Sequence, residues 1–107
     1  MLYKFKSKAA GDVIMMGPAG DDVLRTIGKA PGATGIIEVA AMPAAIAALE
    51  EAVASEEAAR AQAEADAKAE GKKLGPRDGV TLRQRAWPLV EMMRRCHAGG
   101  HEIVWGV

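Results

Sequence analysis

A stretch of twenty residues without one large apolar side chain constrains this sequence more than any other feature. Residues 54–73 hold eight of the chain's 22 alanines among charged residues, and no Val, Ile, Leu, Met or aromatic residue. Such a stretch cannot bury enough surface to offset the entropy lost on ordering. The hydrophobic core must therefore come from two flanking blocks, residues 1–53 and 80–107.

The remaining composition suits one small domain. The 107 residues include 30 large apolar side chains, enough for one compact core and too few for two. We therefore interpret 1–107 as a single domain. Within it, residues 54–79 are expected to be a solvated extension of a helix, favoured by the high helix propensity of alanine, followed by a flexible spacer.

Charge and cysteine content narrow the function classes. Fourteen basic and fourteen acidic residues balance, which disfavours nucleic acid as a partner. No apolar run approaches the roughly 18 residues of a membrane span, and the alternating start of the chain is unlike a signal peptide. The single cysteine, Cys96, excludes an internal disulfide framework. We expect a cytoplasmic protein without membrane contact.

Strand patterns occur at both ends of the sequence. Tyr3 and Phe5 alternate with Lys4 and Lys6, as in a half-buried strand. The apolar run 13–16 predicts a second strand, expected to be central and to form an antiparallel hairpin with the first. Residues 35–37 can form a short extended piece. The closing residues 101–107 predict a strand that joins the hairpin.

Three helices are predicted between these strands. The first covers residues 20–28, after a loop at 17–20, and Gly28 is placed to end it. The second begins near Pro43 and buries one stripe: Met42, Ile46, Leu49 and Val53. The third covers residues 82–97, with a capping box from Thr81 to Gln84 and this apolar stripe: Leu82, Ala86, Leu89, Met93 and Cys96. The fold class is therefore α+β in two layers, with a small, mostly antiparallel sheet covered by helices.

The potential catalytic and metal-binding residues are few. A structural zinc site needs four ligands, whereas Cys96, His97 and His101 supply three at most, and Cys96 lies on the buried stripe. The loop at 17–20 lacks the pattern of a phosphate loop, and two aspartates follow it. We therefore predict no catalytic residue, no cofactor and no metal ligand.

Trp87 suggests an interaction surface on the third helix. On a helical wheel it lies off the buried stripe, beside Arg83 and Arg94. An exposed tryptophan among arginines is typical of an interface anchor, although packing of the second helix alongside would bury it within the domain. The candidate interaction surface comprises Arg83, Trp87, Arg94, His97 and His101.

Four stretches of the chain resemble a known family. Residues 1–15 (MLYKFKSKAAGDVIM), 42–50 (MPAAIAALE), 82–93 (LRQRAWPLVEMM) and 103–107 (IVWGV) are similar to the domain of unknown function 1840 family of small bacterial proteins. The resemblance spans nearly the whole chain outside the alanine-rich spacer. It implies a stand-alone bacterial cytoplasmic protein and supplies no activity or site residue.

These observations favour a non-enzymatic interaction or regulatory module. Its partner is expected to be a second copy of the chain or another protein. The alternative from a different class is a small-ligand or metal-dependent protein that uses His97 and His101 with nearby Arg and Trp side chains. A pocket shared by these residues would favour that alternative.

Overall fold

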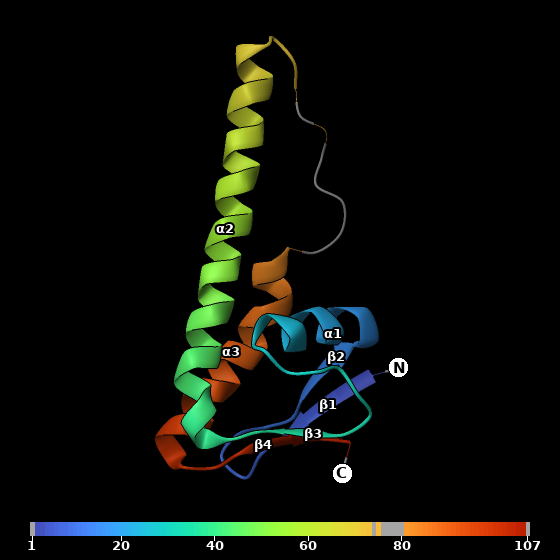
Figure 1. The fold of residues 1–107 in the computed structure, drawn as a ribbon, viewed down its shortest axis with the longest axis vertical. Helices are drawn as coiled ribbons and strands as arrows, with labels where there is room; N and C mark the ends of the chain where they lie inside the picture. Colours follow the sequence, from blue (N-terminus) through green and yellow to red (C-terminus); the bar gives the residue numbers. More distant parts are fainter. Residues whose placement is uncertain (1, 74, 76–80, 107) are drawn as a thin grey trace.

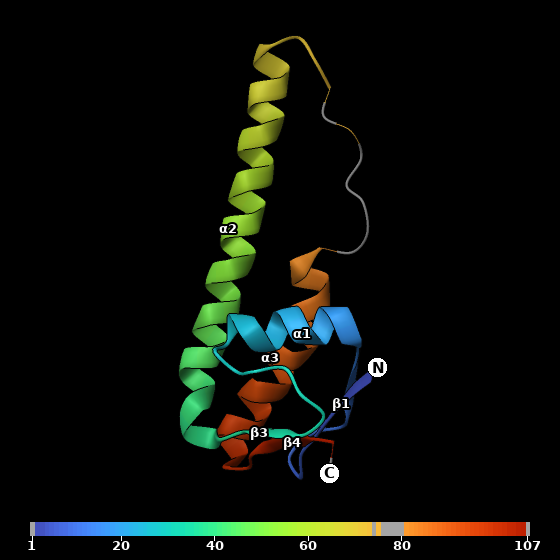
Figure 2. The same ribbon diagram turned by 45° about the vertical axis from the view of Figure 1, so that its right-hand side comes forward.

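Four antiparallel strands form one sheet, and three helices pack against one of its faces (Figure 1, Figure 2). The computed structural model describes residues 2–73, 75 and 81–106. The strands are β1 (Leu2–Lys6), β2 (Val13–Met16), β3 (Gly35–Ile37) and β4 (Ile103–Trp105), in the order β2-β1-β4-β3. The helices are α1 (Gly17–Thr26), α2 (Met42–Ala69) and α3 (Leu82–Gly99), with a 3-10 turn at Val39–Ala41. The predicted two-layer α+β class is confirmed.

The strand at the start of the chain lies in the middle of the sheet. Strand β1 pairs with β2 on one side and with β4 on the other, with Phe5 opposite both Val13 and Trp105. Tyr3 and Phe5 are buried beneath the helices, as their alternation with lysines predicts. Pairing of the C-terminal strand with the N-terminal hairpin is confirmed as well.

An aromatic cluster forms the centre of the core. The ring centroids of Tyr3 and Phe5 are 5.9 Å apart, and the Trp105 ring lies 5.7 Å from Phe5 in an edge-on orientation. Gly20 of α1 lies against the Tyr3 ring and Gly35 of β3 against the Trp105 ring, so closely that neither position has room for a Cβ atom. Two glycines therefore let an adjacent helix and strand approach the aromatic side chains.

Helix α2 has a buried start and a solvated remainder. Its fully or nearly fully buried residues are Met42, Ala45, Leu49 and Val53, all within the first twelve positions of this 28-residue helix. The helix continues to Ala69, about 42 Å at 1.5 Å per residue, and projects beyond the rest of the molecule (Figure 1). The predicted solvated extension is helical as far as Ala69, whereas the predicted spacer falls largely on residues 74 and 76–79, outside the described residues. Among the described residues, no helix is long and apolar enough to cross a membrane.

Helix α3 follows its predicted pattern and buries more than one stripe. The capping box between Thr81 and Gln84 is present, and Gly100 ends the helix with a φ of 71°. The predicted stripe is buried from Ala86 onward, and Val90 and Met92 are buried in addition. The helix therefore contacts both the sheet side of the core and its neighbour α2.

Two sequence-based expectations are wrong. Strand β2 is an edge strand, not a central one, because β4 occupies the other side of β1. Residues 17–20 do not form a loop: they are the first turn of α1, where Pro18 is tolerated because a first-turn N–H has no partner within the helix. Gly28, with a φ of 83°, lies just past the end of α1 as predicted.

Candidate functional site

Trp87 lies between two guanidinium groups on the α2 side of α3. The central carbon of Arg83 is 5.5 Å from the centroid of the indole, and that of Arg94 is 5.2 Å from it. The indole is half-buried and packs against the hydrophobic core. This arrangement is a double cation–π contact within one helix.

Both arginines also connect α3 to α2. Arg83 donates two hydrogen bonds to Glu57, from Nε at 3.1 Å and from Nη2 at 2.5 Å. Arg94 donates to Glu50 at 3.1 Å. The arginines and Trp87 therefore stabilise the packing of two helices of the same chain, and helix α2 occupies the place beside these arginines that the sequence had suggested for another protein.

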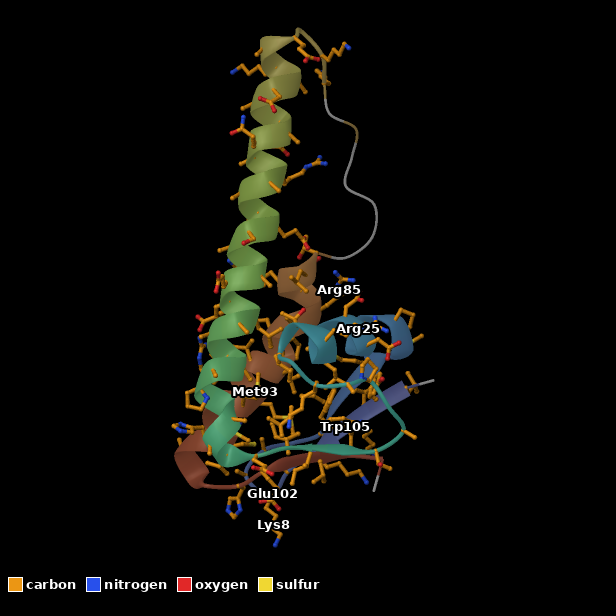
Figure 3. The ribbon with its side chains drawn as sticks, in the orientation of Figure 1. Lys8, Arg25, Arg85, Met93, Glu102 and Trp105 are labelled. Carbon is orange, nitrogen blue, oxygen red and sulfur yellow. The ribbon has the colours of Figure 1, made fainter. Side chains whose placement is uncertain are left out.

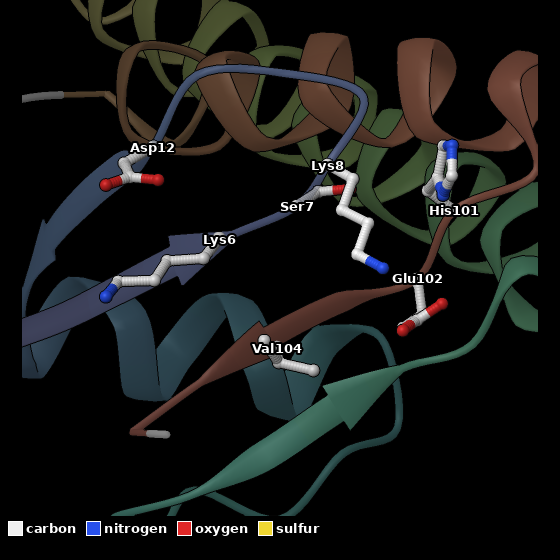
Figure 4. Close-up of a pocket in the computed structure, with 7 residues that line it drawn as sticks. All are labelled: Lys6, Ser7, Lys8, Asp12, His101, Glu102 and Val104. Carbon is white, nitrogen blue, oxygen red and sulfur yellow. The ribbon is translucent and has the colours of Figure 1, made fainter.

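The two histidines of the candidate surface lie toward and beyond the C-terminal end of α3. His97 is exposed on α3, and His101 follows the helix. His101 lines a hollow of about 430 Å³ on the side of the sheet away from the helices, together with six other residues (Figure 4): Lys6, Ser7, Lys8, Asp12, Glu102 and Val104. The structure thus divides the predicted surface: Arg83, Trp87 and Arg94 belong to a helix–helix contact, His101 lines a hollow, and His97 is exposed on α3.

The hollow carries side chains of both charges. Asp12 and Glu102 contribute carboxylates, and Lys6 and Lys8 contribute ammonium groups. Among residues 2–73, 75 and 81–106, no group of three or more His, Cys, Asp or Glu side chains is placed to hold a metal ion. Cys96 is buried. Nothing in this geometry favours the metal-dependent alternative.

One buried ionisable group has a perturbed titration. The Tyr3 hydroxyl donates a hydrogen bond to Asp21 of α1. That hydrogen bond, followed by burial and the negative charge of Asp21, raises the pKa of Tyr3 above its ordinary value of 10.0. The neutral phenol therefore holds the start of α1 against the sheet, and its position inside the core suits a structural role.

The outer face of the sheet, which is turned away from the helices, is the most unusual surface. It carries Leu2, Lys4, Lys6, Ile14, Met16, Ile36 and Val104. Four of these side chains are large, apolar and exposed: Leu2 (60%), Ile14 (61%), Met16 (67%) and Ile36 (41%). Lys8 and Glu102 project from the same side of the molecule, whereas Trp105 and Met93 lie between sheet and helices (Figure 3).

Three of the exposed apolar residues adjoin one another at the edge of the sheet. Leu2 lies directly opposite Met16, and Ile14 lies opposite Lys4 in the same strand pair. We call Leu2, Ile14 and Met16 the apolar corner. The sequence did not reveal this corner, because the apolar run 13–16 was expected to form a central strand. The available signal was Leu2, an apolar residue in phase with Lys4 and Lys6 on the outward side of β1, which is otherwise polar.

The comparisons with known proteins identify a family without a described activity. The model of the family described as a domain of unknown function (DUF1840) matches residues 1–105, which is nearly the entire chain. No curated protein and no solved structure matches the chain. Because the match extends over both sheet-forming ends and all three helices, the chain belongs to the DUF1840 family.

Proposed function

We propose that the protein is a small interaction module that self-associates through the outer face of its sheet. One observation carries this proposal: the helices cover only one face, and the other exposes four large apolar side chains. An antiparallel sheet can leave one face in water, but that face is then normally polar. Contiguous apolar patches on a protein surface typically mark interaction sites.

A second copy of the chain is the partner that the charges favour. Beside the apolar corner, the outer face and its hollow carry lysines and carboxylates in similar number, among them Lys6, Lys8, Asp12 and Glu102. A partner that carries mainly one sign of charge would leave either the lysines or the carboxylates of this face without an opposite charge. Two copies related by a two-fold axis can place the lysines of one against the carboxylates of the other. Their sheets would then pack about 10 Å apart, as in other stacked sheets.

The size of the face predicts weak association. Strands about 4.8 Å apart, with residues spaced by about 3.4 Å, give a face of roughly 300 Å² in projection. A standard interface buries about 800 Å² from each partner, which is one eighth of this chain's 6448 Å². Side chains that project from the sheet increase the accessible area beyond this projection. The area of the face is nevertheless at the lower end of the range for stable interfaces. We expect reversible dimers that form with increasing concentration.

Sedimentation velocity from micromolar to millimolar concentration tests this function. The unchanged chain should show a concentration-dependent shift toward dimer. Ile14→Thr keeps a β-branched strand former but removes an apolar side chain that is 61% exposed. Burial of that fraction contributes about 1 kcal/mol or more in each copy, so the dissociation constant should rise more than tenfold.

A matched control separates the outer face from the rest of the surface. Ala58→Ser alters an exposed position of α2, remote from the sheet, and should leave the dissociation constant unchanged. A chain that stays monomeric to millimolar concentration would overturn the proposal. So would equal effects of Ile14→Thr and Ala58→Ser, because the outer face would then contribute nothing specific.

We also assign the protein to the cytoplasm as part of this proposal. The support is the single cysteine, Cys96, which is buried and unpaired, as is usual in a reducing compartment. Fractionation of cells that express the protein with a small epitope tag tests this assignment. Recovery from an extracytoplasmic fraction would contradict it.

A further inference from the structure

A second, mainly apolar groove lies beside the free edge of β2, between that strand and two helices. Its volume is about 520 Å³, within the range of roughly 300–1,000 Å³ that is usual for small-molecule sites. Its apolar walls come from the edge strand, the first turn of α1 and the second turn of α3: Val13, Ile14, Met15, Met16, Pro18, Ala19 and Pro88. The groove is therefore built by two consecutive elements, β2 and α1, and by α3, which is far from them in sequence.

Arg85 supplies the positive charge of the groove. In Figure 3 its side chain lies between α3 and α1, and it lines the groove. Among the described residues, the Nε atom of Arg85 is the one buried side-chain nitrogen or oxygen without a hydrogen-bond partner. A buried donor of this kind normally has a partner, because leaving it unpaired costs free energy.

The nearby acid does not satisfy this guanidinium. Asp22 approaches Nη1 of Arg85 at 3.7 Å, which is too long for a hydrogen bond, and it also pairs with Arg25 at 3.6 Å. The Asp22 carboxylate is more than half exposed, so its charge is partly screened by solvent. Nε itself is shielded from solvent, but the Arg85 side chain is 29% exposed and lines the groove, so its guanidinium can meet an acceptor that enters there.

We infer that this groove binds a small monocarboxylate with an unbranched apolar tail. A guanidinium donates paired hydrogen bonds to a carboxylate, and apolar walls next to it favour a hydrocarbon chain. The aspartates near the start of α1 argue for one negative charge instead of the two of a phosphate group. The groove shares Ile14 and Met16 with the apolar corner, but the inference does not rest on the proposed self-association, because Arg85 and Ala19 carry the charge and the tail contact and lie off the outer face.

Calorimetric titration with hexanoate, octanoate and decanoate, below their micellar concentrations, tests the ligand class. Each added methylene group should tighten binding about twofold to fourfold, up to the length that fills the groove. Acetate should bind far more weakly than octanoate, and so should octylammonium, which has the same tail and the opposite charge. Equal binding of octanoate and octylammonium, or no dependence on chain length, would overturn the inference.

Variants of the groove test the residues. Arg85→Met removes the charge and keeps much of the side-chain volume, so octanoate should bind at least tenfold more weakly. Arg95→Met, at an exposed position of the same helix, is the matched control and should bind as the unchanged chain does. Ala19→Leu fills the apolar part and should abolish the gain from decanoate over octanoate. Far-ultraviolet circular dichroism checks that each variant is folded.

The two variants fail in different ways if the inference is wrong. Undiminished binding by folded Arg85→Met would show that the carboxylate is not recognised there. An undiminished chain-length effect in folded Ala19→Leu would place the tail elsewhere. Neither result would bear on the outer face, whose test is the dissociation constant of the dimer.

Discussion

The extension of α2 should fold and unfold independently of the core. Beyond Val53 the helix contributes no buried residue, so a helix-breaking change there costs only local structure. Ala65→Gly, in the exposed part, should lower the free energy of global unfolding by less than about 0.5 kcal/mol, because the helix can end earlier without exposing the core. Ala45→Gly, at a position that is 5% exposed, should cost about 2 kcal/mol. That sum comprises about 1 kcal/mol of helix propensity and about 0.8 kcal/mol for the lost methyl group.

Urea unfolding with two probes measures both effects. The chain has two tryptophans, Trp87 and Trp105, and both lie in the core block, so their fluorescence reports the core. Circular dichroism at 222 nm reports the extension as well. Ala65→Gly should reduce helical signal without moving the fluorescence midpoint, whereas Ala45→Gly should lower that midpoint by roughly 1–2 M for an m-value of 1–2 kcal/mol/M. Equal shifts of the fluorescence midpoint in the two variants would refute the independence of the extension.

Three further predictions concern the core and its borders. The raised pKa of Tyr3 means that its contribution to stability is complete below the unfolded pKa of 10 and is lost as the pH rises through the folded value. The free energy of unfolding should therefore fall above pH 10, less steeply in Asp21→Asn, with absorbance at 295 nm reporting this sole tyrosine. Leu49→Ala, at a fully buried position, should cost about 2–5 kcal/mol in a urea titration, and a cost under 1 kcal/mol would contradict its place in the core. A double-mutant cycle between Glu50 and Arg94, both roughly half exposed, should give a coupling of about 0.2–1 kcal/mol that shrinks in high salt; a larger, salt-independent value would indicate a buried pair.

Local signals predicted most of the elements correctly. The capping box at Thr81, the glycine past α1 and the stripe on α2 each depend on interactions within a few residues, and all are present. The start of α1 was missed because Gly17 and Gly20 are poor helix formers on their own. Gly20 is helical because the Tyr3 ring packs against it, and that contact spans seventeen residues of sequence.

The surroundings of the candidate interaction surface depend on long-range contacts, which the periodicity of apolar residues along the sequence does not reveal. A wheel for α3 shows one apolar stripe, which is the expectation for a helix with one neighbour. The helix instead packs against both the sheet side of the core and α2, so Val90 and Trp87 are buried or half-buried on a second side. Arg83 and Arg94 meet acids of α2 that lie 26 and 44 residues away in sequence. Similarly, the edge position of β2 is decided by where β4 inserts, which the apolar run 13–16 cannot reveal.

The order of the strands also bears on how the chain is made. Strand β4 lies between β1 and β3, so β3 has no partner in the sheet until residues 103–105 are available. During vectorial synthesis the β1–β2 hairpin can form early, since its strands are close in sequence. The β3–β4 half of the sheet can form only after nearly all of the described chain has left the ribosome. The ring of Trp105 then packs against Gly35 of β3. Ribosome-bound chains that lack β4 should therefore expose the hydrophobic side chains of β3 and of the β4-facing edge of β1 to chaperones.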